Sequence, residues 1–443
     1  MKALDRDILR LAVPALGALV AEPLFLLTDT ALVGHLGETP LAGLSIASAL
    51  LQTAIGLLIF LAYATTPAVA RRLGAGDRPG AIRAGIDGLW LAALLGGVLV
   101  AVGVAAARPL VHLFGASAAV EEQAVVYLTV SLAGLPAMLL VIAATGLLRG
   151  LQDTKTPLVV AVSGFAANAG LNALFIYGFG FGIAGSAAGT VVAQWAMAAV
   201  YLVIAVRASR SERVSLRFGL AGVSGAAASG GWLFLRTASL RAALLATVVV
   251  ASTLGIVELA TFQIASTLFF TLAFILDALA IAGQALVGHG LGAQDVARVT
   301  GVMRRLVRWG IGAGVALGIL LAALSPLLGP VFSSSRDVQQ ALLVVVLVMA
   351  AGTPLAGYVF VLDGVLIGAG DARYLALSGV VNVAIYAPLL GLVALFFSDK
   401  TAGTNGTAAL VWLWLAFGFG YLGARALTLG LRARGTAWMS SGG

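Results

Sequence analysis

The sequence predicts an all-α membrane protein with twelve transmembrane helices in two six-helix bundles. Composition gives the first reason, because hydrophobic residues make up 61% of the 443 residues and charged residues only 10%. A soluble domain carries about 25% charged residues, so this chain cannot cover a water-facing surface. The other two reasons are the length of its apolar runs and an internal repeat.

The apolar runs reach the roughly 20 residues needed to cross a bilayer core. They are too long and too continuous for barrel strands, and backbone groups in lipid must bond within their span, so helices are expected. The expected spans are residues 10–34, 43–69, 86–107, 121–147, 157–177, 184–206, 231–255, 259–287, 307–328, 339–367, 374–397 and 408–430. We therefore expect an N-terminal lobe (1–206), a cytoplasmic linker (207–230) and a C-terminal lobe (231–443).

The distribution of positive charge sets the expected direction of these spans. With the N-terminus inside, 23 of the 26 Lys and Arg residues fall on the inner face, leaving Arg108, Arg336 and Lys400 outside. This asymmetry follows the positive-inside rule. The net charge of +8 is therefore a topology signal, and no nucleic-acid partner is expected. We expect a multi-pass protein of the cell (inner or plasma) membrane with both termini in the cytoplasm.

The two halves of the chain resemble each other at one constant, gapless offset. The run Leu73-Gly74-Ala75 with Asp77 returns as Leu291-Gly292-Ala293 with Asp295, and Pro136 and Gly150 return as Pro354 and Gly368. Six spans per half make the copies parallel, so a pseudo-twofold axis along the membrane normal is expected to relate them. Such folds expose a cavity alternately to the two sides, which indicates transport.

Several classes of function are not supported by any motif. The chain has no cysteine, and its three histidines are far apart, so neither a metal site nor a cofactor is expected. The run at 180–185 fits GxGxxG but falls in a short outer loop without a preceding strand, so it is no dinucleotide site. There is no Walker lysine motif and no Ser/His/Asp or Cys/His set. We therefore do not expect an enzyme.

Polar side chains within the spans are the candidate functional residues, because a charged group at a helix centre costs about 2.5–3.5 kcal/mol on insertion scales. Glu22 and Asp29 lie seven residues apart and share a helix face. We expect these two acids to bind the coupling proton. The residues expected to line the substrate cavity are Asn168, Asn172, Asp277, Gln284 and Asp363.

Structural roles remain open for the same residues. Asp29 could be an interfacial acid near the outer end of its span, and Glu22 precedes Pro23, where a kink or a structural contact is equally compatible with the sequence. Asn168 and Asn172, four residues apart, could simply bond a neighbouring helix.

Five stretches together resemble the multidrug and toxic compound extrusion (MATE) family, specifically its DinF-like branch. They are LTDTALVGHLG, ARRLGAGD, GLLRGLQDTKTP, LDALAIAGQALVGHGLGAQD and LDGVLIGAGDAR. The resemblance implies two six-helix lobes forming a V-shaped cavity. It also implies export of organic, often cationic or amphipathic, compounds in exchange for H⁺ or Na⁺.

The resemblance also bears on single residues. The family's first-helix aspartate matches Asp29, which implies a coupling role there. Its Asn-x-x-x-Asp pair on the fifth helix falls on Asn168 and Asn172, so the second position departs from the pattern. Because an amide does not titrate, Asp29 would act alone or with Glu22.

The function expected from the sequence is a secondary active multidrug efflux antiporter, coupled to H⁺, working by alternating access as a monomer with small-molecule substrates. A Na⁺-coupled exporter stays open, with Asp277, Asp363 and Glu258 as oxygen ligands. A lipid-linked precursor flippase of the same superfamily would need a basic cavity lining. It is disfavoured because nearly all Lys and Arg residues are expected at the inner ends of the spans.

Overall fold

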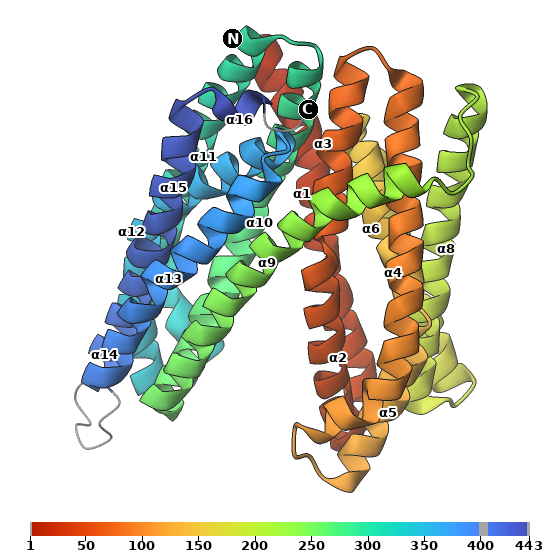
Figure 1. Cartoon of the computed structure of the whole chain (residues 1–443). Coiled ribbons are helices and arrows are strands. Elements are labelled where there is room, and N and C mark those ends of the chain that lie inside the picture. Colours follow the sequence, from red (N-terminus) through yellow and green to blue (C-terminus); the bar gives the residue numbers. More distant parts are fainter. Residues whose placement is uncertain (1, 398–405, 441–443) are drawn as a thin grey trace. The chain divides into compact units, whose positions relative to one another are not determined.

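The computed structural model describes residues 2–397 and 406–440, except the side chains of residues 2, 3 and 22 (Figure 1). Over these ranges the chain is helical and contains no strand. Its elements are α1 (Lys2–Gly34), α2 (Glu38–Leu58), α3 (Phe60–Gly74), α4 (Arg78–His112), α5 (Ala118–Leu132), α6 (Leu135–Gly150), α7 (Lys155–Ala173), η1 (Leu174–Gly178), α8 (Gly182–Ser211), α9 (Leu220–Leu254), α10 (Ile256–Gly292), α11 (Val296–Phe332), α12 (Arg336–Gly368), α13 (Ala372–Phe397), α14 (Gly406–Leu415), η2 (Ala416–Tyr421), α15 (Leu422–Arg434) and α16 (Ala437–Ser440). The elements η1 and η2 are π-helical turns.

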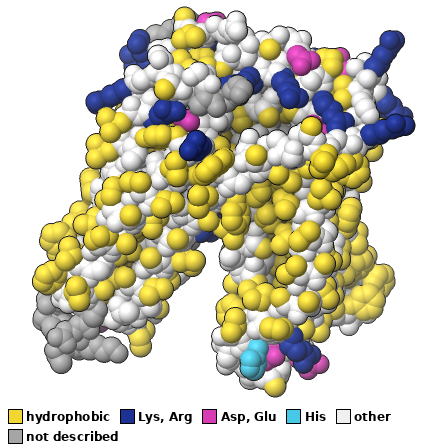
Figure 2. Space-filling model, viewed as in Figure 1, with side chains coloured by type: hydrophobic (Ala, Val, Ile, Leu, Met, Phe, Trp, Pro, Cys, Tyr) yellow, Lys and Arg dark blue, Asp and Glu magenta, His cyan; other side chains and the backbone are white. Residues whose placement is uncertain are grey.

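The number of spans agrees with the fold class expected from the sequence. Eleven helical segments of the described chain are long and apolar enough to cross a membrane. The twelfth is the pair α5 and α6, which bend by 50° at a short break. The all-α, twelve-helix fold class is therefore confirmed. Hydrophobic side chains cover the middle of the helices, whereas most visible Lys and Arg side chains lie toward one end (Figure 2).

The seventh span differs from its expected bounds. It was expected over 231–255, but α9 starts at Leu220, and only residues 212–219 of the expected linker lie outside helices. The added turns are rich in Gly, Ala and Ser, which allow close packing: the space next to Gly222 is filled by the Asp87 carboxylate of α4. Arg236 and Arg241, placed at the inner face by the sequence count, consequently lie several turns inside this span.

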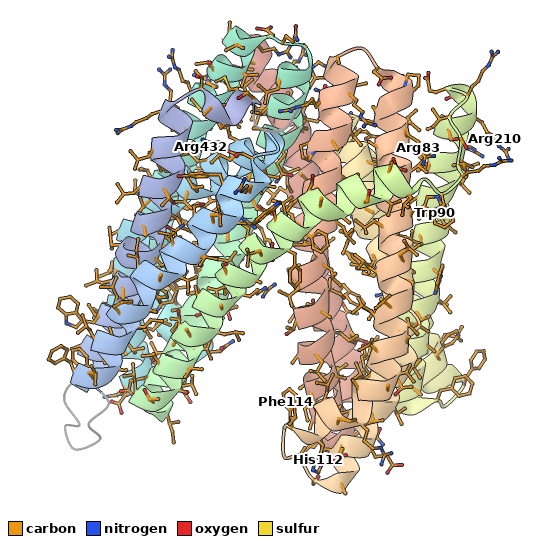
Figure 3. All side chains as sticks on the ribbon, in the orientation of Figure 1. Arg83, Trp90, His112, Phe114, Arg210 and Arg432 are labelled. Atoms are coloured by element: carbon orange, nitrogen blue, oxygen red, sulfur yellow. The ribbon has the colours of Figure 1, made fainter. Side chains whose placement is uncertain are left out.

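The connector 212–219 is held on α4. Arg83 donates from Nη1 to the carbonyl oxygens of Ser215 (2.8 Å) and Arg217 (2.9 Å). Trp90, labelled with Arg83 in Figure 3, donates from Nε1 to the carbonyl of Leu216 (3.0 Å). Three backbone acceptors outside a helix are thereby satisfied, which gives this segment a defined course.

The chain divides into two compact units. The N-terminal unit comprises residues 13–230 and 292–294, and the C-terminal unit comprises residues 1–12, 231–291 and 295–443. Residues 1–12 were expected in the N-terminal lobe. They belong instead to the C-terminal unit, where Asp5 pairs with Arg305 through two bonds of 2.5 and 2.7 Å.

The repeat is visible in local structure within each unit. Asp77 accepts a hydrogen bond from the backbone nitrogen of Gly80 (2.8 Å) at the start of α4. Asp295, its counterpart in the second half, accepts one from Arg298 (2.9 Å) at the start of α11. Both residues have nearly the same backbone angles, φ −87°, ψ 73° and φ −91°, ψ 76°. Each is a helix N-cap, which satisfies a donor that the helix itself leaves free.

Candidate functional site

Four helices of the N-terminal unit converge on one carboxylate. Asp29 of α1 is only 4% exposed. It accepts hydrogen bonds from Tyr127 Oη of α5 (3.0 Å), Asn172 Nδ2 of α7 (2.9 Å) and Ser186 Oγ of α8. No Lys, Arg or His in the described ranges forms an ion pair with it. The side chain of Asp29 is thus buried in a polar cluster and is not exposed at the surface of its unit.

The second layer of this cluster is built from helical spacing. Asn168 and Asn172, four residues apart on α7, both donate to Thr190 Oγ1, over 2.9 and 3.4 Å. Ser186 and Thr190 are four apart on α8 and present the matching face. Gly189 lets the two helices approach, since an added Cβ would stand 2.9 Å from the backbone nitrogen of Asn172. The cluster is thus fixed by side chains and by backbone packing together.

One acceptor in the cluster is unused. Asn172 is fully buried, and its Oδ1 has no hydrogen-bond partner within the described residues, although its Nδ2 has two. A buried amide oxygen without a partner costs about 1–3 kcal/mol. This oxygen lies against Gly189 of α8, where an added Cβ would overlap with it, so a turn of the amide is needed before it can face Asp29.

Two small cavities lie at this polar cluster, and one of them is lined by Asp29. One, of about 60 Å³, is lined by Asp29 and Tyr127, by further polar side chains and by apolar ones; the other polar side chains are Ser48, Gln52, Ser131, Thr190 and Gln194. A second, of about 50 Å³, is lined by Asn168 and Thr190, by two glutamines, two methionines and two phenylalanines, and by Ile55 and Ala193. Those phenylalanines, Phe25 and Phe165, stack with ring centroids 5.2 Å apart. The carboxylate therefore borders space large enough for water.

The sequence identified half of this site. Asp29, Asn168 and Asn172 were expected and do come together. The hydroxyl groups of Tyr127, Ser186 and Thr190 were missed. The i, i+4 spacing of Ser186 and Thr190 was a usable signal, whereas nothing in the sequence marks Tyr127 among the aromatic residues. The side chain of Glu22 lies outside the described residues.

The acid of α12 has a different environment. Asp363, in the C-terminal unit, is paired with Arg236 of α9 and with Arg425 of α15, the latter over 3.0 Å. Both guanidinium groups are almost buried. Both carboxylate oxygens of Asp363 therefore pair with cations, and its expected place in the substrate cavity stays a prediction.

The remaining expected cavity residues lie on α10 of the same unit. Gln284 is buried, and Asp277 is half-buried. No group of three or more acidic or histidine side chains converges in the parts of the chain that are described. Asp277, Asp363 and Glu258, the oxygen ligands considered for Na⁺, therefore do not form such a group among the described residues.

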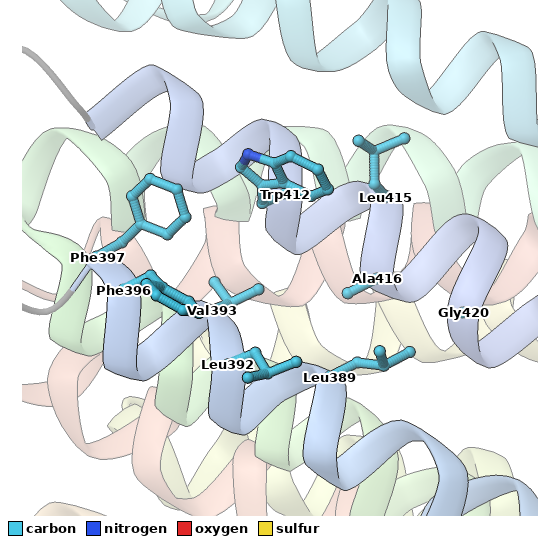
Figure 4. A pocket seen from close by; sticks show the side chains of 9 residues that line it. All are labelled: Leu389, Leu392, Val393, Phe396, Phe397, Trp412, Leu415, Ala416 and Gly420. Carbon is cyan, nitrogen blue, oxygen red and sulfur yellow. The ribbon is translucent and has the colours of Figure 1, made fainter.

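A groove on the C-terminal unit is lined by apolar side chains. It has a volume of about 630 Å³ and follows α13, α14 and η2 (Figure 4). Its walls are Leu389, Leu392, Val393, Phe396, Phe397, Trp412, Leu415, Ala416 and Gly420. None of these side chains can bind a proton, so the groove is not a candidate for coupling.

The chain is similar to known proteins over most of its length. The sequence model of the MatE family matches residues 14–174 and again 234–393, one match in each half of the chain. Protein DETOXIFICATION 43 of Arabidopsis thaliana is 31% identical over 302 residues, which cover 68% of this chain and 55% of the relative. DNA damage-inducible protein F of Escherichia coli is 26% identical over 416 residues, covering 89% and 88%. The crystal structure of the Vibrio cholerae MATE transporter VcmN in the bent form superimposes with a TM-score of 0.85 at 20% identity, covering 98% of each chain.

Proposed function

Because the chain belongs to the MatE family, whose members are transporters and not enzymes, we propose that it is a secondary active antiporter that exports small organic compounds in exchange for protons. The resemblance to the MATE family noted in the sequence is thus confirmed. Its function as a proton-coupled multidrug exporter is our proposal. It rests chiefly on the environment of Asp29.

The supporting observation is a buried carboxylate held only by neutral donors. An ionised acid at membrane depth is costly unless it is paired. Asp29 has hydroxyl and amide donors but no ion-pair partner in the described chain, so binding one proton removes the charge without breaking a salt bridge. A group that gains and loses a proton as its access to water changes is what proton coupling requires.

The amide of Asn172 can serve both protonation states. Its Nδ2 donates to the ionised carboxylate. Once Asp29 carries a proton, the carboxyl group becomes an O–H donor, and the free Oδ1 of Asn172 can accept that bond after a turn of the amide. The family pattern has an acid at position 172. In this chain an amide stands there, and Asp29 of α1 is the acid that it contacts.

In the proposed cycle, the substrate binds from the inside while Asp29 is ionised. After the protein exposes its site outward, protonation of Asp29 rearranges its bonds to α5, α7 and α8, and the substrate leaves. Inward movement of one charge is worth about 2.3 kcal/mol per 100 mV of membrane potential. One proton per cycle is thus sufficient for moderate accumulation.

The test is dye export in reconstituted liposomes with a pH gradient and a Na⁺ gradient imposed separately. We expect the parent protein to move the cationic dye ethidium or the anionic dye carboxyfluorescein under the pH gradient, and Asp29→Asn to lose the gradient dependence. Asp337→Asn changes an exposed acid at the start of α12 and should behave as the parent. Equal gradient-driven export by Asp29→Asn would refute the role of Asp29.

A Na⁺-coupled exporter is the second candidate, and the unpartnered Oδ1 of Asn172 favours it. After a turn of the amide, this oxygen and the Asp29 carboxylate would offer oxygen ligands of the kind that hard cations prefer. In the same assay, export driven by the Na⁺ gradient alone would select this candidate.

We also propose that the protein is a monomer in the cell membrane and that both of its termini lie in the cytoplasm. Reporter fusions at each terminus test this orientation.

A further inference from the structure

Arg241 occupies an unusual position for a charged side chain. It belongs to α9, which is long and apolar enough to span a membrane and runs from Leu220 to Leu254. At about 1.5 Å per residue, Arg241 lies roughly 31 Å from the first residue of this helix and roughly 20 Å from the last, along the helix axis. The side chain is therefore remote from both ends of the span.

Arg241 is exposed, and it pairs with no carboxylate among the described residues. The buried face of α9 at this level is formed by Thr237, Ala243 and Thr247. Arg236, five residues earlier, contacts Asp363 in the interior of the unit. The two arginines of this helix therefore have separate roles, and only Arg241 presents its guanidinium group outward.

An exposed arginine at this depth must face water rather than lipid. Arginine does not deprotonate in proteins, and arginines within spans almost always face the protein interior or a water-filled cavity. Long side chains near helix ends can extend to the membrane surface. The distance from Arg241 to either end of α9 exceeds the reach of one side chain.

We propose that Arg241 binds the anionic group of an exported compound, a carboxylate, phosphate or sulfonate. The guanidinium fork matches such groups with two parallel hydrogen bonds. The inference rests on the proposed export function and narrows its substrates to organic anions and zwitterions. The sequence argument against a flippase placed nearly all Lys and Arg residues at the inner ends of the spans. Arg241 is an exception to that placement.

A phospholipid headgroup offers the same phosphate chemistry. Headgroups lie at the two membrane surfaces, whereas Arg241 is remote from both ends of α9. The position therefore favours a soluble compound over a headgroup at the membrane surface.

Binding of carboxyfluorescein, followed by fluorescence anisotropy in phosphatidylcholine nanodiscs, tests the proposal. Loss of a charge-assisted bidentate contact should raise the Kd at least about tenfold in Arg241→Gln. Arg241→Lys should raise it less, because it keeps the charge. Arg304→Gln, an exposed arginine near the start of α11, should bind as the parent does. The thermal unfolding midpoint of Arg241→Gln in detergent should match that of the parent, which reports that the variant is folded.

Three results would overturn the inference. The first is a parent protein that does not bind carboxyfluorescein, and the second is an unchanged Kd in Arg241→Gln. The third is displacement of the dye from the parent by added phosphatidylglycerol, which would assign the site to a lipid headgroup. Binding needs no ion gradient, so a parent that binds the dye but exports nothing under any gradient would refute the proposed function and leave the assignment of Arg241 standing.

Discussion

Two buried aspartates of this chain are held in opposite ways. Asp29, in the N-terminal unit, accepts hydrogen bonds from a phenol, an amide and an alcohol. Asp363, in the C-terminal unit, lies between the guanidinium groups of Arg236 and Arg425. Both acids are less than a tenth exposed, so burial does not distinguish them.

The two acids differ in how readily each can bind and release a proton. Protonation of Asp363 would leave two buried cations without the carboxylate that they share, which opposes proton binding. Protonation of Asp29 removes a charge that no cation balances among the described side chains. The neutral environment suits a proton carrier, whereas the charged environment suits a structural link joining α9, α12 and α15. Whether an acid within a span is a candidate for proton coupling therefore depends on whether its partners are neutral donors or cations.

The largest expected effect is on stability, at Asp363. Replacing it with alanine removes the carboxylate from two almost buried guanidinium groups, and breaking such a buried pair costs about 3–5 kcal/mol. We expect a marked fall in the thermal unfolding midpoint in detergent, measured by intrinsic fluorescence. Asp337→Ala, at an exposed acid, is the control and should leave the midpoint unchanged. A parent-like midpoint for Asp363→Ala would show that the two aspartates do not differ as described.

The next effect concerns the donor to Asp29. Asn172→Leu removes a hydrogen bond to a charged group, worth about 1.5–3 kcal/mol, so pH-driven export should fall about tenfold or more. Asn168→Leu removes only the bond to Thr190 and should cost much less. Export assays in liposomes compare the two variants. Equal losses would indicate that α7 contributes general packing and no specific support to the acid.

A steric change tests the same support without altering any polar group. The added methyl group of Gly189→Ala would be forced against Asn172, and such overpacking costs about 1–3 kcal/mol. We expect weaker proton-driven export. Gly170→Ala is the matched control in α7, where nothing lies within 4 Å of the new methyl group, and it should be neutral or slightly stabilising. Similar export rates in both variants would argue against a close contact at Gly189.

The smallest effect is expected at a third acid. Asp87 pairs with Arg83, four residues earlier on α4, over 2.7 Å. Since Arg83 is partly exposed, the pair should contribute at most about 1 kcal/mol. Asp87→Asn should retain full proton coupling in the liposome assay. Loss of coupling would mean that a salt-bridged acid can carry the proton, and the contrast between Asp29 and Asp363 would lose its meaning.

The sequence was sufficient for the fold because that information is local. Apolar length and positive charge define spans one at a time, and repeated residues such as Asp77 and Asp295 show a related local structure at one offset. The error at α9 arose because Gly, Ala and Ser between 220 and 230 resemble a linker in composition. Gly222 in this stretch packs against Asp87 of α4, a contact that only the folded chain supplies.

The candidate site was only partly predictable, because partners of a buried acid come from distant helices. Tyr127 lies 98 residues from Asp29 and Ser186 lies 157 residues from it. The spacing of four residues predicted that Asn168 and Asn172 share a face, because helical periodicity relates residues of the same helix. It could not show that Asp363 meets two arginines on other helices.

Proton release on ligand binding tests the central claim most directly. Purified protein in a weakly buffered solution with a pH-sensitive dye would be mixed with whichever of ethidium or carboxyfluorescein it binds. If one acid couples the two ligands, the parent should release about one proton per bound molecule, and Asp29→Asn should bind the ligand without releasing any. Equal proton release by the parent and by Asp29→Asn would contradict the account.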